Sequence, residues 1–127
     1  MTPEAIRDRL MALRWPKVAA CAIAGHLQQL GGDPRPFPRW QPDRQDRFKD
    51  WCSAKDHADR DSLDVQLQWL NHELCGSGYS RLGGRLALAS DIEDAVLIMA
   101  GYVSPGEVLP DLYERIMAAK ALMGEVT

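Results

Sequence analysis

The chain has 127 residues, enough for one domain around one hydrophobic core, and we expect a single domain over residues 1–127. Hydrophobic residues make up 46% of it, close to the average of globular proteins, which argues against disorder. The net charge is −3 and no run rich in Lys and Arg occurs, so electrostatics give no reason to expect a nucleic-acid partner.

Apolar residues recur with helical spacing along almost the whole chain, which predicts an all-α fold of about seven helices. Thr2, Asp43, Ser62 and Asp91 stand where N-caps are expected, because their side chains accept hydrogen bonds from the free N–H groups of a first turn. Gly101 is expected to end the sixth helix. The predicted helices cover about residues 3–13, 16–30, 43–55, 63–76, 79–88, 92–100 and 108–123.

Glycine and proline punctuate this pattern. The glycine pair at 31–32 is expected to end the second helix, and three prolines within residues 33–40 predict a stiff, extended loop. The glycine pair at 83–84 weakens helix 79–88 by about 1 kcal/mol per glycine relative to alanine. We expect that this pair permits a close crossing of two helices.

The last predicted helix, 108–123, carries Leu112, Ile116 and Met123 on one face. Such a face either covers the core of the same chain or docks a neighbouring protein, and the sequence leaves both interpretations open.

The three cysteines, at 21, 52 and 75, are odd in number and widely spaced, so we expect reduced, buried thiols in a protein made in a cytoplasm. The histidines at 26, 57 and 72 are too scattered to predict a metal site, and no cofactor motif occurs. The first residues do not read as a signal peptide, and no apolar run reaches the roughly 18 residues that a membrane span needs.

Four segments, taken in order, resemble the phage tail lysozyme family. They read AACAIAGHLQQLGGDP (19–34), WQPDRQDRF (40–48), SLDVQLQWLNHEL (62–74) and, more weakly, DIEDAVLIMAGYVSPG (91–106). The resemblance covers about residues 17–106 and leaves helix 108–123 outside it. The third segment is the most specific, because it matches the family's s-L-d-x-Q-L-x-F-L-x-x-E-L in register. The matching residues there are Gln66, Leu67, Trp69, Leu70, Glu73 and Leu74.

The chain departs from the family where the chemistry is done. The family pattern G-N-x-x-x-E-S-G-x-N-P places its catalytic Glu at the position of Gln29. A glutamine amide cannot deliver the proton that a glycosidase acid gives to the leaving oxygen. Only residues 35–39 separate Pro34 from Trp40, where the family has a longer glycine-rich segment that lines the sugar cleft. We therefore expect a lysozyme-like fold whose small β-lobe is reduced or absent.

The resemblance and the stiff proline-rich loop, which carries Phe37 between prolines, together single out candidate site residues. Gln29, Phe37, Trp40 and Arg44 are candidates for binding a sugar or a partner surface, although a solvent-facing Gln29 and a core-packed Trp40 are the simpler interpretations. Asp33 is a weak candidate for a displaced catalytic acid, since an aspartate before proline ordinarily forms a turn.

One matching carboxylate falls outside this group. Glu73 matches a family position that we interpret as structural, paired with an arginine or a backbone group.

From the resemblance we expect a pseudo-lysozyme of a phage tail, baseplate or ejection apparatus, which is made in the bacterial host cytoplasm and incorporated in the particle. It would touch peptidoglycan or other virion proteins without cutting glycan. Two alternatives stay open. The chain could be an active peptidoglycan hydrolase (muramidase) with a displaced acid, or a small helical adaptor or inhibitor whose likeness is in packing only.

Overall fold

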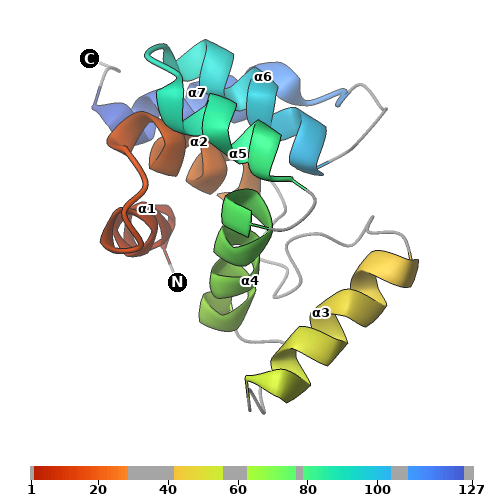
Figure 1. The fold of residues 1–127 in the computed structure, drawn as a ribbon. Coiled ribbons are helices and arrows are strands. Elements are labelled where there is room, and N and C mark those ends of the chain that lie inside the picture. Colours follow the sequence, from red (N-terminus) through yellow and green to blue (C-terminus); the bar gives the residue numbers. More distant parts are fainter. Residues whose placement is uncertain (1, 29–41, 56–62, 77–78, 104–108, 125–127) are drawn as a thin grey trace.

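The computed structural model describes residues 2–28, 42–55, 63–76, 79–103 and 109–124. This part of the chain is almost entirely helical and contains no strand, which confirms the predicted all-α class (Figure 1). The seven helices are α1 (Pro3–Ala12), α2 (Lys17–Gln28), α3 (Pro42–Ala54), α4 (Leu63–Gly76), α5 (Ser80–Leu88), α6 (Ile92–Val103) and α7 (Leu112–Met123).

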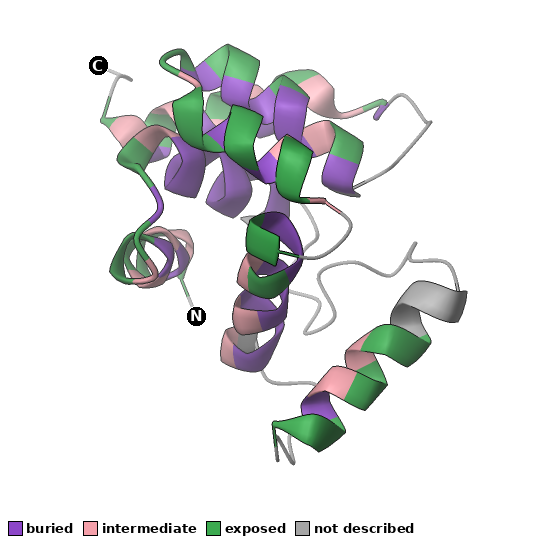
Figure 2. Cartoon of the chain, in the orientation of Figure 1, coloured by how far each residue is buried: buried purple, intermediate pink, exposed green. Residues whose placement is uncertain are grey.

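Helix α2 forms the centre of the main bundle. All of its side chains from Ala19 to Leu27 are buried, which Figure 2 shows as a nearly continuous purple helix. A helix that is apolar on every side must be surrounded, and α1, α6 and α7 all pack against it. Its many alanines suit this position, because small side chains let the neighbouring helices approach closely.

Helix α7 approaches α2 closely at a glycine. A Cβ atom added to Gly25 would lie 2.9 Å from the Cβ of Ala119, so only glycine allows this crossing. Ala119 and Leu122 are buried, and Leu112, Ile116 and Met123 pack against the core from partly buried positions. The face of the last helix that sequence analysis left open therefore covers the core of its own chain.

Helix α1 is fixed at both ends by local backbone chemistry. The Thr2 hydroxyl accepts a hydrogen bond from the Ala5 N–H at 3.1 Å, which confirms the predicted cap. Beyond the C-terminal end, Arg14 takes a left-handed conformation with a φ of 77°, which reverses the chain ahead of α2.

Two side-chain contacts then join this region to α4. The Trp15 indole N–H donates to Asn71 Oδ1 at 3.0 Å, and Arg9 binds Asp64 at 2.6 Å.

The glycine pair in α5 serves a close crossing, as predicted, but only one of the two glycines takes part. A Cβ on Gly83 would lie 1.9 Å from the carbonyl oxygen of Leu74 in α4, whereas a Cβ on Gly84 would meet nothing within 4 Å. Helix α5 thus packs against α4 through its backbone at Gly83.

Three predicted helix boundaries are corrected by the structure. Helix α3 begins at Pro42, so Asp43 lies inside the first turn and is not the N-cap. A proline is tolerated at this first position because the first N–H groups of a helix have no partner. Helix α6 continues through Gly101 to Val103. Helix α7 begins at Leu112, about four residues later than predicted, and residues 109–111 before it are not helical.

Candidate functional site

The sequence-predicted site residues lie largely outside the described part of the chain. Gln29, Asp33, Phe37 and Trp40 all belong to residues 29–41, which the structure does not describe. Arg44 lies in the first turn of α3, where only the backbone is described. The structure therefore neither brings these five residues together nor separates them.

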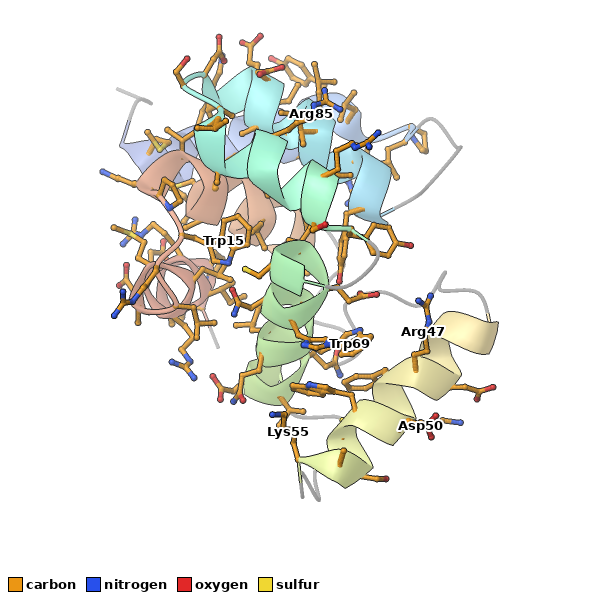
Figure 3. The ribbon with its side chains drawn as sticks, viewed as in Figure 1. Trp15, Arg47, Asp50, Lys55, Trp69 and Arg85 are labelled. Atoms are coloured by element: carbon orange, nitrogen blue, oxygen red, sulfur yellow. The ribbon has the colours of Figure 1, made fainter. Side chains whose placement is uncertain are left out.

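The segment after α2 leads to α3, which contacts α4 through aromatic rings. Phe48 and Trp51 lie on one face of α3, and Trp69 and His72 lie on the facing side of α4 (Figure 3). The ring centroids of Trp51 and Trp69 are 5.4 Å apart, and those of Trp69 and His72 are 5.3 Å apart and stacked. These spacings are typical of attractive aromatic pairs, so this aromatic cluster holds α3 against α4.

The neighbouring residue on α4 has a different role. Glu73 is 1% exposed and accepts a hydrogen bond of 2.6 Å from the Tyr102 hydroxyl of α6. The Tyr102 ring in turn meets the Tyr79 ring edge-on, with centroids 5.3 Å apart. Sequence analysis suggested an arginine or a backbone group as the partner of Glu73, whereas the partner described here is a tyrosine hydroxyl. A buried carboxylate bound in this way ties α4 to α6 and is kept from solvent.

A second buried polar network joins α2, α6 and α7. The Nε2 of His26 donates to the Val96 carbonyl at 2.9 Å, and its Nδ1 accepts from the Arg115 guanidinium at 3.1 Å. This assignment of the tautomer follows from Arg115, which can only donate. The Nε of Arg115 binds Asp111 at 2.9 Å, so the charge of the guanidinium is balanced near the surface.

This network changes the acid–base properties of its members. Burial is the largest effect and lowers the pKa of His26 to about 4. The hydrogen bond to Val96 raises the pKa by less, and the nearby Arg115 charge lowers it by a smaller amount still. His26 is therefore neutral at physiological pH. The Asp111 carboxylate is engaged by Arg115 and does not bond to the first N–H groups of α7, which explains why that helix has no side-chain cap.

A shallow depression of about 360 Å³ lies where the start of α6 meets the end of α7. Its charged groups are already engaged, since Lys120 binds Glu93 at 2.6 Å and Asp91 accepts from the Glu93 N–H at 2.7 Å. The second contact confirms Asp91 as the predicted cap of α6. The depression offers no pair of free catalytic groups among these residues.

The described residues form no metal-binding cluster, and one of their three cysteines is exposed. No group of three His, Cys, Asp or Glu side chains lies close enough to hold a metal ion there. Cys21 and Cys52 are buried, as predicted, but the prediction of a buried thiol is wrong for Cys75, which is exposed near the end of α4. No described helix is long and apolar enough to cross a bilayer.

The buried polar groups of this fold were not found by sequence analysis. His26 was considered only as a metal ligand, and Arg115, Asp111 and Tyr102 were not singled out. A histidine inside an otherwise apolar, alanine-rich helix was the one available signal of a buried partner. Comparisons with models of known families, with characterised proteins and with solved structures find no match to this chain.

Proposed function

We propose that this chain is a non-hydrolytic, lysozyme-like protein of a phage tail, baseplate or ejection apparatus, which binds peptidoglycan or neighbouring virion proteins. The observation that carries this proposal is the glutamine at position 29, where the resembling family has its catalytic glutamate. With no carboxyl group at this position, the proton needed to cleave a glycosidic bond has no donor there.

The packing of α4 supports the proposal. The residues of this helix that match the family are core positions in the structure: Gln66, Leu67, Trp69, Leu70, Glu73 and Leu74 are all buried. Glu73 accepts a hydrogen bond from Tyr102, so this residue of the best-matching helix joins α4 to α6. A retained scaffold without its acid fits a protein that keeps a binding or structural role.

Binding is tested by sedimenting the protein with insoluble, purified peptidoglycan and measuring the fraction that pellets. We expect the native chain to pellet with the wall and Trp40→Ala with Arg44→Ala to pellet less, because stacking and charge at these positions are the proposed contacts. A matched control is Arg47→Ala, an exposed arginine of α3 (Figure 3).

Incorporation into tail particles and hydrolysis of the wall, measured beside this sedimentation, separate the alternatives. Incorporation into tail particles without wall binding would leave a structural role in the virion. Neither wall binding nor association with tail proteins would contradict the proposal and favour an adaptor or inhibitor. Wall hydrolysis by the native chain that disappears in Asp33→Asn, with the helical content unchanged, would favour an enzyme with a displaced acid.

A further inference from the structure

Helices α5, α6 and α7 are neighbours with α6 between the other two, and we call them the outer layer (Figure 1). Helix α7 also contacts α1, since Arg7 donates to the Leu122 carbonyl at 2.9 Å. On one side of α6, Leu82 of α5 approaches Gly101, since a Cβ there would lie 3.4 Å from its Cδ1. On the other side, Lys120 of α7 binds Glu93. The outer surface of this layer belongs to three neighbouring helices.

The register of α6 against α7 places three exposed apolar residues together. His26 contacts both Val96 and Arg115, while Lys120 reaches Glu93, so the two helices run antiparallel. Leu97 lies one turn beyond Glu93, and Met117 and Tyr113 lie about one and two turns before Lys120. These three residues, 52%, 38% and 69% exposed, form what we call the apolar strip. They are three of the five large hydrophobic residues exposed in the described part of the chain.

Beside the apolar strip, Lys120 and Arg115 are paired with Glu93 and Asp111, which leaves acidic side chains as the unpaired charges among the described residues there. The charged side chains of α5 are all basic. Asp94 and Glu114 are exposed on α6 and α7, at opposite margins of the strip. Helix α5 contains no acidic residue, and its exposed face carries Arg81, Arg85 and Leu88 at helical spacing (Figure 3). Leu88 is 86% exposed. Within the described residues, no ion pair engages either these two arginines or these two acids.

We propose that this layer is a homodimer interface in which α6 lies near a two-fold axis. An axis parallel to α6 places α5 of each copy over α7 of the other, so the arginines of α5 face Glu114 of the partner twice. Leu97 then meets its symmetry mate, and Leu88 of one copy contacts Met117 and Tyr113 of the partner. Two-fold dimers are the commonest soluble assemblies because one self-complementary surface forms the contact twice. The occupant of the apolar strip is therefore a second copy of this chain.

The dimer is independent of peptidoglycan binding, since it uses neither residues 29–41 nor α3. Failure of one proposal leaves the other standing, because self-association is measured with the purified chain alone.

The first test is the molar mass of the full chain by sedimentation equilibrium over a range of concentrations. We expect the native protein to reach twice the chain mass. Leu97→Glu, a substitution at an exposed position, should raise the dissociation constant by about 100-fold because it places two like charges at the axis. Met11→Glu is the matched control, since Met11 is 42% exposed on α1, a helix that takes no part in the proposed interface. It should dimerise as the native chain does.

The second test reverses charges on the two facing surfaces. We expect Arg81→Glu with Arg85→Glu to be monomeric, and likewise Glu114→Arg, because each then places like charges where α5 of one copy faces α7 of the other. Mixing the two monomeric proteins should give a one-to-one dimer, since both contacts again join opposite charges. Helical content measured by circular dichroism should stay unchanged in all variants. A native monomer at every concentration, an unweakened Leu97→Glu dimer, or no association on mixing would each overturn the proposal.

Discussion

The two neighbouring glycines of α5 should respond to the same substitution with opposite signs. Gly84→Ala adds a methyl group where nothing lies within 4 Å, so the gain is that of helix propensity, about 0.8–1 kcal/mol of unfolding free energy. Gly83→Ala gains the same propensity, but its Cβ would stand 1.9 Å from the Leu74 carbonyl oxygen. That oxygen is backbone, so α4 and α5 must separate by more than 1 Å to restore an ordinary contact.

The cost of such overpacking is about 1–3 kcal/mol or more, which exceeds the propensity gain. We therefore expect Gly83→Ala to be destabilised by about 1–2 kcal/mol net and Gly84→Ala to be stabilised. At about 4 °C per kcal/mol for a chain of this size, the two melting temperatures should differ by roughly 8 °C. Urea unfolding and thermal unfolding followed by circular dichroism measure both variants directly. A Gly83→Ala protein as stable as Gly84→Ala would refute the close crossing of α4 and α5.

Three further predictions concern buried polar groups and one strained residue. Below its ordinary pKa of 6.5, His26 takes up a proton in the unfolded chain but not in the native fold, where its pKa is about 4. The free energy of unfolding should thus fall by roughly 3 kcal/mol between pH 6.5 and 4. His26→Gln keeps a donor and an acceptor but does not titrate, so urea unfolding at several pH values should show a smaller fall for this variant. Tyr102→Phe removes a donor to buried Glu73 and should lower the unfolding free energy by about 1.5–3 kcal/mol, measured by urea titration; an unchanged midpoint would contradict this role. Arg14→Gly relieves the positive φ and should raise the free energy of unfolding by up to about 1 kcal/mol, seen as a slightly higher melting temperature. A loss of stability would show that the Arg14 side chain contributes more than the strain costs.

Periodicity predicted the helices of this fold well because each helix buries a face whose apolar residues recur every three to four positions. It could not locate the start of α7, since the Asp111 carboxylate binds Arg115 of its own helix instead of capping it. Nor could it foresee that α6 passes through Gly101, which lies beside Leu82 of α5. These boundaries depend on tertiary contacts that a single segment does not encode.

The buried contacts between distant residues were beyond the reach of pattern reasoning. His26 and Arg115 are separated by 89 positions and belong to helices that periodicity describes only one at a time. The same holds for Glu73 and Tyr102, 29 positions apart. The candidate site is a different case, because Gln29 and Trp40 lie outside the described residues and stay predictions from the sequence.

The most direct test of the central claim is the release of soluble reducing sugar from purified peptidoglycan, measured for the native chain and for Gln29→Glu side by side. The account predicts no release by the native chain at any protein concentration. Release by Gln29→Glu alone would show that the missing carboxyl is what separates this protein from a hydrolase. Release by the native chain would contradict the account, because another group would then supply the proton.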